Sequence, residues 1–339
     1  MRILLLVPTL LLLSCQSPKG DLPASGPRKN EYGVPQYSEV QSGGVKMIQV
    51  DGKYNVWTKQ VGRGDIKVLL LHGGPGFGHE YLECFESFFP QADIELYEYA
   101  QLGNFNSDKP TDATLWTIDR YREEVEQVRK GLGLENFYLL GHSWGGMLAL
   151  EYAFKYQQHL RGLVVSNMTA SIDSYTKYTG ELKSRLPADI IATMEKYEKA
   201  GKFEAPEYQD IIMSRIYSQY ICRLNPWPDP VMRSFTHFNA QIYNTMQGPN
   251  EFVITGNFKH WDVWEKLKTI TVPSLMIGAT YDEMNPDDIK KMASLIPNAD
   301  ALICNGSHLS MYDDQQTYFN GLIKFLKDVH ADKFKRGTM

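Results

Sequence analysis

The sequence predicts an α/β fold, with a mostly parallel, doubly wound sheet and a helical segment inserted between its strands. Short apolar runs of strand length, such as Ile66–Leu71 and Phe137–Leu140, alternate with amphipathic helical patterns. The alternation stops between residues 167 and 261, where helical segments occur without a clear strand, and then it resumes. With 339 residues and 43% hydrophobic content, the chain is long enough to bury the core of such a fold.

The first elements follow one another from residue 45. Val45–Val50 and Tyr54–Val61 predict a hairpin, because Asp51-Gly52 between them favours a two-residue turn. Ile66–Leu71 and Ile94–Tyr99 predict strands, and the continuous apolar run of the first is typical of a strand covered on both faces. A helix is predicted next, since apolar residues recur at spacings of three and four: Ile118, Tyr121, Val125, Val128 and Leu132.

The later elements frame an inserted segment. A strand is predicted at Leu160–Ser166, and residues 41–166 form the first part of the predicted α/β core. Residues 167–261 predict a helical cap, with helices such as Ala188–Ala200 and Tyr208–Ile221. Residues 262–335 predict the second part of the core; its strands and last helix are expected at Val272–Gly278, Ala299–Cys304 and around Tyr318–Val329.

The cap is rich in aromatic residues. Six of them could line an apolar pocket, but we expect more of them in the core of the cap, because helices need packing partners of their own: Tyr217, Tyr220, Trp227, Phe235, Phe238 and Tyr243.

The first fifteen residues predict a secretory signal. One arginine precedes an apolar run that is too short to span a membrane comfortably, and Leu12-Leu13-Ser14-Cys15 resembles the lipobox of bacterial lipoproteins. Cleavage before Cys15 would leave a lipidated cysteine at the new N-terminus. Residues 16–40 carry Ser, Pro, Gly and Lys, which predicts a flexible tether. We expect an exported protein, lipid-anchored in the bacterial cell envelope and facing the periplasm or the cell surface; the alternative is an ordinary signal peptide or an interfacial anchor.

Composition excludes several kinds of partner. The formal charge of −5 and the lack of a long basic run argue against nucleic acid. Besides Cys15, the widely spaced Cys84, Cys222 and Cys304 form no metal-binding or redox pattern; an exported location permits a disulfide, but buried thiols are the prediction. No dinucleotide fingerprint, phosphate-binding loop or zinc motif occurs, so neither a cofactor nor a metal is implied.

The central motif is Gly141-His-Ser-Trp-Gly145, between the predicted strand at Phe137–Leu140 and a helix from Met147. A G-x-S-x-G sequence at a strand-to-helix turn places a serine above the sheet, near the positive end of the following helix. An activated serine needs a base and a group that orients the base. Asp282 follows one predicted strand and His308 follows the next, so three strand ends supply Ser143, Asp282 and His308.

Two backbone N–H groups are candidates for stabilising an oxyanion. One belongs to Trp144, which follows the serine, and the other to the glycine loop His72-Gly-Gly-Pro-Gly76 after an early strand. Within that loop Gly74 is the expected donor, because glycine lets the backbone approach a substrate closely.

These segments together resemble the proline iminopeptidases. The resemblance rests on His72–Gly76, on Gly141-His-Ser-Trp-Gly-Gly146, on Gly278-Ala-Thr-Tyr-Asp-Glu283 and on Gly306-Ser-His308, and it runs from about Tyr54 to Val329. These enzymes are serine aminopeptidases of the α/β-hydrolase fold, and the similarity is to the tricorn-interacting type. One segment departs from the family pattern Tyr-Asp-Gln-x-Gly-x-Gly-x-Ser, since Ala100 replaces the aspartate and Phe105 the second glycine.

The resemblance implies how a substrate is held. In this family two glutamates bind the free α-amino group, and they match Glu251 and Glu283. The expected activity is release of an N-terminal residue, preferably proline, from short peptides through an aminoacyl-enzyme, without a cofactor. The alternatives are a carboxylesterase or amidase on the same scaffold, and a surface-binding lipoprotein without turnover.

Overall fold

The computed structural model describes residues 29–34 and 42–338, which belong to two units divided at Ser42 and Gly43. In the first unit the side chain of Asn30 accepts hydrogen bonds from the backbone N–H groups of Tyr32 and Val34 at 3.0 and 2.9 Å. The second unit holds the strands and helices given below. The predicted signal peptide, Cys15 and most of the predicted tether lie outside the described residues. Within the described ranges, no helix is both long and apolar enough to cross a membrane.

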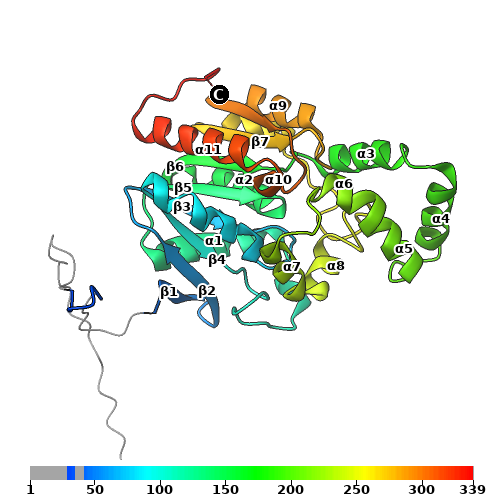
Figure 1. The fold of residues 1–339 in the computed structure, drawn as a ribbon, viewed down its shortest axis with the longest axis horizontal. Coiled ribbons are helices and arrows are strands. Elements are labelled where there is room, and N and C mark those ends of the chain that lie inside the picture. Colours follow the sequence, from blue (N-terminus) through cyan, green and yellow to red (C-terminus); the bar gives the residue numbers. More distant parts are fainter. Residues whose placement is uncertain (1–28, 35–41, 339) are drawn as a thin grey trace, which may run out of the picture. The chain divides into compact units, whose positions relative to one another are not determined.

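An eight-stranded sheet forms the centre of the second unit (Figure 1), in the order β1-β2-β4-β3-β5-β6-β7-β8. β2 pairs antiparallel with β1 and with β4, and every other pairing is parallel. The prediction of a mostly parallel, doubly wound sheet is therefore confirmed. The strands are β1 (Val45–Val50), β2 (Tyr54–Val61), β3 (Ile66–Leu71), β4 (Ile94–Tyr99), β5 (Phe137–His142), β6 (Leu160–Ser166), β7 (Ser274–Ala279) and β8 (Ala299–Cys304).

Two features of the backbone show how the sequence sets the ends of the strands. Asp51 and Gly52 have φ values of 54° and 62°, the left-handed conformation that an Asp-Gly hairpin turn favours. Val50 pairs with Tyr54, so the loop between β1 and β2 has three residues and not the expected two. β7 begins two residues later than expected, at Ser274 rather than Val272. Pro273 precedes it, and proline has no N–H group to donate to a neighbouring strand.

Helices cover both faces of the sheet, and each face has its own apolar core. On one face α1 (Ile118–Leu132), α2 (Trp144–Tyr156) and α9 (Pro286–Leu295) share one apolar core with Leu69 and Leu71 of β3. On the other face η1 (Glu80–Ser87) and α11 (Gln315–His330) pack against the alternate residues Val68 and Leu70. Strand side chains alternate in direction, so the continuous apolar run of β3 serves both cores, as its composition predicts.

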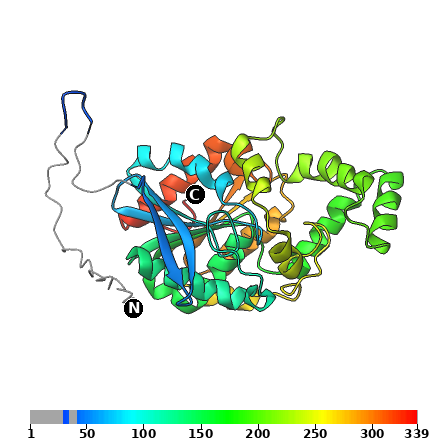
Figure 2. The same cartoon turned by 90° about the horizontal axis from the view of Figure 1, so that it is seen from below.

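Residues 167–261, called the cap below, contribute no strand to the sheet. Figure 2 shows part of the cap projecting beyond one end of the sheet. A small separate core stabilises this projection: Met194, Tyr208, Ile211, Ile212 and Ile216. The helices of the cap are α3 (Ile172–Lys183), α4 (Ala188–Lys199), α5 (Pro206–Ile211), the π-helix η5 (Ile212–Tyr217), α6 (Ser218–Tyr220), α7 (Asp229–Thr236) and α8 (Ala240–Met246). The helix expected at Tyr208–Ile221 is thus divided by a π-helical turn.

Short helical turns join the larger elements: η2 (Pro90–Ala92), η3 (Ala113–Leu115), η4 (Gln157–His159), η6 (Trp264–Thr269) and α10 (Ser310–Asp313).

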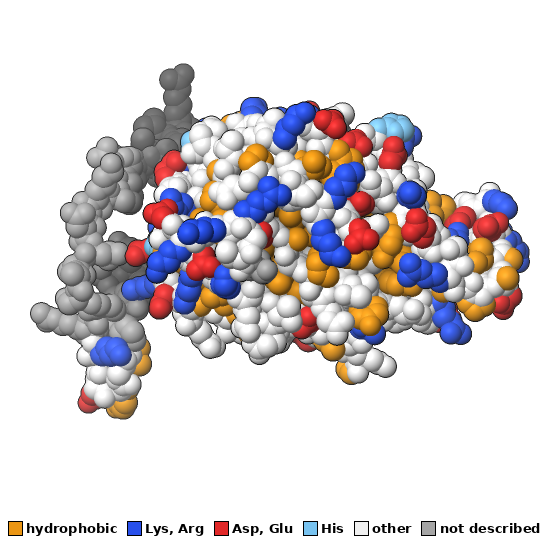
Figure 3. Space-filling view, turned by 90° about the horizontal axis from the view of Figure 1, so that it is seen from above, with side chains coloured by type: hydrophobic (Ala, Val, Ile, Leu, Met, Phe, Trp, Pro, Cys, Tyr) orange, Lys and Arg blue, Asp and Glu red, His pale blue; other side chains and the backbone are white. Residues whose placement is uncertain are grey.

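On the face shown in Figure 3, basic and acidic side chains are interspersed. Cys84, Cys222 and Cys304 are free thiols, and the last two are buried.

Candidate active site

Ser143 is the single residue between β5 and α2, at a sharp turn of the backbone. Its φ and ψ are 56° and −127°, which bulky residues rarely adopt, and its N–H donates to the carbonyl oxygen of Ser166 at 2.9 Å. The side chain stands at the carboxyl edge of the sheet and at the N-terminus of a thirteen-residue helix. The helix dipole there favours negative charge that develops near the serine.

Close packing of the backbone explains the glycines on either side of Ser143. A Cβ atom at Gly141 would lie 1.9 Å from the carbonyl oxygen of Gly145, and one at Gly145 would lie 2.1 Å from that of Leu71. Both contacts are with backbone atoms, which cannot move aside as a flexible side chain does. The strand can therefore turn into the helix within one residue only because these positions lack side chains.

His308 and Asp282 form the expected pair beside Ser143. Nδ1 of His308 lies 2.9 Å from Oδ1 of Asp282, and His308 and Ser143 line one cavity of about 430 Å³. The fully buried Asp282 also accepts hydrogen bonds from the N–H of Met284 at 3.0 Å and from Nδ2 of Asn167 at 2.7 Å. Charged hydrogen bonds of this kind hold a carboxylate in one orientation. The base is thus positioned by an acceptor that is itself fixed.

The cap supports the loop that carries the base. The N–H of His308 donates to the carbonyl oxygen of Tyr220, and the N–H of Leu309 donates to that of Ile221, both at 2.9 Å. Tyr220 closes α6 of the cap. The position of the base therefore depends on the cap as well as on β8.

Gly73 and Gly74 of the glycine loop line the cavity with Ser143. The N–H of Gly73 donates to the hydroxyl oxygen of Tyr81 at 2.6 Å. Gly74 has a φ of 118°, and a Cβ atom there would lie 2.6 Å from the backbone nitrogen of Phe77. Of the two N–H groups, that of Gly73 is already used by Tyr81, which leaves Gly74 as the candidate donor in this loop. Trp144, the second candidate, is the first residue of α2.

A chain of hydrogen bonds that the sequence did not predict joins the glycine loop to the base. The hydroxyl of Tyr81 lies 3.0 Å from Nδ1 of His142, and Nε2 of His142 lies 2.9 Å from the carbonyl oxygen of His308. Because a carbonyl only accepts, His142 carries its proton on Nε2, and Nδ1 accepts from Tyr81. Burial, together with the charge of His308 when protonated, holds the pKa of His142 well below its usual range, so the ring is neutral.

Gln101 makes a second connection, between the glycine loop and the helix after Ser143. Its side-chain oxygen accepts from the indole Nε1 of Trp144, and its Nε2 donates to the carbonyl oxygen of His72, both at 2.9 Å. The backbone N–H of Gln101 donates to Nε2 of His72 at 3.0 Å. Burial lowers the pKa of His72 to about 4, so this ring is neutral and can accept.

The segment that departs from the family pattern is accommodated by its neighbours. The fully buried Ala100 donates from its N–H to the carbonyl oxygen of Trp57 and accepts at 2.6 Å from the hydroxyl of Ser107. Phe105 has a φ of 44°, a conformation that favours the glycine of the family pattern. Its ring packs edge-on against Trp57 and His79, with centroids 5.2 and 4.7 Å apart.

Glu251 lies in the cavity and is held by three donors. Its carboxylate accepts from the hydroxyls of Tyr243 at 2.6 Å and Tyr175 at 2.9 Å, and from Nε2 of Gln247 at 2.9 Å. Burial is the main reason that the pKa of Glu251 is raised above its usual value. The cavity therefore contains an oriented carboxyl group.

Glu283 is fully buried next to Asp282, and neither of its oxygens accepts a hydrogen bond from another described residue. One oxygen lies 3.9 Å from Nδ1 of His308. The hydroxyl of Tyr175 lies near enough to Glu283 to act against the rise in its pKa, but the hydrogen bond of this hydroxyl goes to Glu251 at 2.9 Å. Burial, and then the charges of Glu251 and Asp282, raise the pKa of Glu283 well above its usual value. A buried acceptor without a donor is costly. Of the two predicted glutamates, Glu251 lines the cavity and Glu283 lies behind its wall.

Aromatic side chains of the cap line more of the cavity than we expected. Five of the six lie on its wall: Tyr217, Trp227, Phe235, Phe238 and Tyr243. Tyr220 instead packs against the separate core of the cap. The expectation that most of the six are core residues was wrong, because the inner face of the cap covers the carboxyl edge of the sheet without filling the space between them.

The sheet, the turn at Ser143 and the His308–Asp282 pair define a serine hydrolase of the α/β-hydrolase class. The alpha/beta hydrolase fold family matches residues 67–315. The proline iminopeptidase of Flavobacterium johnsoniae is 49% identical over 287 residues, which cover 83% of this chain and 97% of that protein. The chain belongs to the proline iminopeptidase family.

Two solved structures have a similar fold. The proline iminopeptidase of Mycobacterium smegmatis superposes with a TM-score of 0.79 at 27% identity, covering 85% of this chain and 99% of that one. The protein VinJ superposes with a TM-score of 0.80 at 31% identity, covering 84% of this chain and 98% of that one.

Proposed function

We propose that this protein is a serine aminopeptidase that releases N-terminal proline from short peptides. The observation that carries the proposal is that one cavity contains Ser143, His308 and Glu251, with the unpartnered carboxyl group of Glu283 3.9 Å from His308. A nucleophile with its base lies beside two carboxyl groups. This arrangement supports cleavage next to a free amino group, and the family's name supports proline as the residue released.

His308 takes the proton of Ser143 as the serine oxygen attacks the carbonyl carbon of the first residue. Asp282 accepts from Nδ1–H of His308, which leaves Nε2 free to accept the serine proton, and it stabilises the imidazolium that forms. The N–H groups of Gly74 and Trp144 stabilise the oxyanion, and each such donor is worth about 3–4 kcal/mol in the transition state. His308 then protonates the leaving amine, and water releases the amino acid from Ser143.

Glu251 and Glu283 select the free N-terminus. The substrate's ammonium group supplies the donors that Glu283 lacks and places a positive charge between two buried carboxylates. An acylated N-terminus brings neither the charge nor the full set of donors, so the carboxylates would be left unpaired in a dry site. Cleavage further along a peptide chain is disfavoured for the same reason.

The proposal is tested with a prolyl arylamide, its N-acetylated form and a p-nitrophenyl ester, with Ser143→Ala as the inactive control. We expect rapid hydrolysis of the free amide and almost none of the acetylated one. Equal rates on the two amides would exclude an aminopeptidase. Hydrolysis of the ester alone would favour the alternative of a carboxylesterase. If the protein hydrolyses none of them and does not react with a fluorophosphonate at Ser143, it is a binding protein without turnover.

We also propose that the protein is a lipoprotein of the bacterial cell envelope. The support is in the sequence, where Ser14 and Cys15 follow an apolar run and precede a polar, proline-containing stretch. An acylated Cys15 would anchor the enzyme to a membrane while the tether separates the cavity from the lipid. Incorporation of labelled palmitate into the wild type and not into Cys15→Ala would support the proposal. Equal labelling, or none in either protein, would contradict it.

A further inference from the structure

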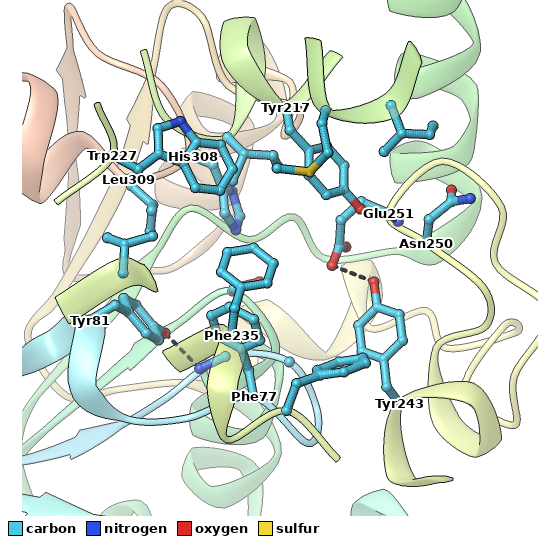
Figure 4. Close-up of a pocket in the computed structure, with 18 of the residues that line it drawn as sticks. Phe77, Tyr81, Tyr217, Trp227, Phe235, Tyr243, Asn250, Glu251, His308 and Leu309 are labelled. Carbon is cyan, nitrogen blue, oxygen red and sulfur yellow. Dashed lines mark hydrogen bonds between the residues drawn. The ribbon is translucent and has the colours of Figure 1, made fainter. Parts of the chain in front are cut away.

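The cavity has two chemically different ends. In Figure 4, Glu251 lies on one side with Tyr243 and Asn250, Trp227 and Leu309 lie on the other, and His308 lies between them. The first end contains oriented acceptors, as described above. The second end consists of apolar side chains.

The chemistry of the proposed reaction assigns a different part of the substrate to each end. In proline the α-amino nitrogen is part of the ring, so the ring lies with its amine at the Glu251 end. The carbonyl carbon must lie next to Ser143. His308 protonates the leaving nitrogen, so the peptide continues past His308 on the side away from Glu251. Trp227 and Leu309 line the cavity on that side (Figure 4). The residue that follows proline therefore meets the second end.

Aromatic contacts make the second end a continuous apolar wall. The ring centroids of Trp227 and Phe235 are 5.6 Å apart, and Phe77 meets Phe235 edge-on at 4.7 Å. The indole Nε1 of Trp227 donates to the carbonyl oxygen of Cys222 at 3.0 Å, so its polar atom is already satisfied. Leu309 is held by its N–H bond to Ile221. The wall is thus fixed in place before a substrate binds.

We infer that this wall, made of Trp227, Phe235 and Leu309, is a subsite for a large apolar side chain on the residue after the N-terminal proline. This inference rests on the proposed function and adds a substrate class to it, namely peptides beginning with proline followed by an aromatic or a large aliphatic residue. A large apolar side chain at the second position is removed from water when it contacts the wall, and this burial stabilises the complex. Glycine at the same position leaves the wall exposed to water.

Charge supports the same assignment. Among the described residues that line the cavity, Glu204 and Glu251 are the only acidic ones, and there is no lysine or arginine. A charged side chain at the second position would lose its hydration without gaining an opposite charge at the wall.

At the mouth, Met232 is 49% exposed and follows Val231, another lining residue, on α7. The apolar surface therefore continues outward from the wall.

The test compares amidated dipeptides, so that no C-terminal carboxylate enters the cavity. For the wild type we expect kcat/KM for Pro-Phe-NH₂ to exceed that for Pro-Gly-NH₂ by roughly tenfold or more, as burial of an aromatic side chain predicts. Trp227→Ala should lower kcat/KM for Pro-Phe-NH₂ by a larger factor than for Pro-Gly-NH₂, so that most of this preference is lost. Trp264→Ala is the matched control: Trp264 is also half-buried, but it lies on η6 and does not line the cavity.

A second variant keeps the test decisive if Trp227→Ala does not fold. Met232→Lys changes an exposed residue at the mouth, and it should raise kcat/KM for Pro-Glu-NH₂ relative to Pro-Phe-NH₂. Equal hydrolysis of Pro-Phe-NH₂ and Pro-Gly-NH₂ by the wild type would overturn the subsite, and so would a preference that survives Trp227→Ala. If neither amide is hydrolysed, the aminopeptidase function itself fails, and the subsite fails with it.

Discussion

Nε2 of His142 donates a hydrogen bond to the carbonyl oxygen of His308, 2.9 Å away. The residue before the nucleophile therefore supports the loop that carries the base. On its other side His142 accepts from Tyr81, whose hydroxyl also receives the N–H of Gly73. Tyr81 and His142 are positioning residues, because Tyr81 acts through the N–H of Gly73 and His142 through the backbone carbonyl of His308. They connect the glycine loop to the loop that carries His308, and both loops must stay correctly positioned relative to Ser143 during the reaction.

Replacing Tyr81 with phenylalanine should slow the reaction without weakening substrate binding. The variant leaves the N–H of Gly73 and Nδ1 of His142 without partners, and such losses cost about 1–3 kcal/mol each. Because the two groups position the glycine loop and the base, we expect kcat to fall roughly tenfold while KM changes little. Steady-state kinetics with a prolyl arylamide measures both.

Tyr138→Phe is the matched control for Tyr81→Phe. Its hydroxyl is also buried and donates to the carbonyl oxygen of Leu326 at 3.3 Å, but Tyr138 does not line the cavity. This variant should lose stability in urea unfolding and keep its kcat. If Tyr81→Phe also keeps its kcat, then Tyr81 serves only to stabilise the fold.

Asp282→Asn should lower kcat by on the order of 10⁴-fold with the fold intact. Three donors converge on this side chain, from His308, Met284 and Asn167. An amide has one acceptor oxygen for them and brings two donors of its own, so His308 loses the acceptor that orients its ring. Asp288→Asn, on α9, is the control: its carboxylate meets the hydroxyl of Thr169 at 3.4 Å, and it does not line the cavity. A kcat for Asp282→Asn within tenfold of the wild type would contradict the assigned role.

Two glycine-to-alanine changes should move stability in opposite directions. At Gly145 the new Cβ would lie 2.1 Å from the carbonyl oxygen of Leu71, and we expect a loss of about 3 kcal/mol or more, or failure to fold. Gly180 is exposed on α3 with no atom within 4 Å of the new Cβ, so alanine should stabilise the helix by roughly 0.5–1 kcal/mol. Urea unfolding measures both. Tolerance of Gly145→Ala would mean that the turn at Ser143 can relax.

Much of the fold and the centre of the site could be predicted because each feature has a local signal. The buried strands are continuous apolar runs, and the turn at Ser143 needs glycine within two residues on each side. Asp282 and His308 could be placed because each follows a strand, and the carboxyl ends of parallel strands meet at one edge of a sheet.

The supporting residues could not be predicted because their partners are distant in the sequence. Tyr81 is 61 residues from His142, and Asn167 is 115 residues from Asp282. A tyrosine in a short helical turn or an asparagine after a strand has no local pattern that indicates its partner. Gln101 is the exception, because it matches the glutamine of the family pattern Tyr-Asp-Gln-x-Gly-x-Gly-x-Ser. The cap aromatics were misjudged since an apolar helical face does not show whether another layer fills the space beside it.

Glu283→Gln should stabilise the substrate-free protein and impair substrate binding. Burial raises the pKa of Glu283, so the folded protein keeps a proton that the unfolded chain has already lost. The free energy of unfolding of the wild type therefore falls as the pH rises from the ordinary glutamate pKa towards the raised one. Glutamine has no proton to lose, so the variant avoids this decline. Urea unfolding at pH 5, 7 and 9 should show an advantage for the variant that grows with pH.

The same substitution should raise KM for a prolyl arylamide roughly tenfold or more, because a hydrogen bond to a charged group is lost. Glu251→Gln separates the two effects. Glu251 already has three donors, from Tyr243, Tyr175 and Gln247, so this variant should also raise KM but gain less stability at alkaline pH than Glu283→Gln. Acidic pH should raise the KM of the wild type, since protonation of either glutamate removes a charge that the ammonium needs. If Glu283→Gln unfolds more readily than the wild type at pH 9, its carboxylate has a partner in the folded protein and is not waiting for a substrate.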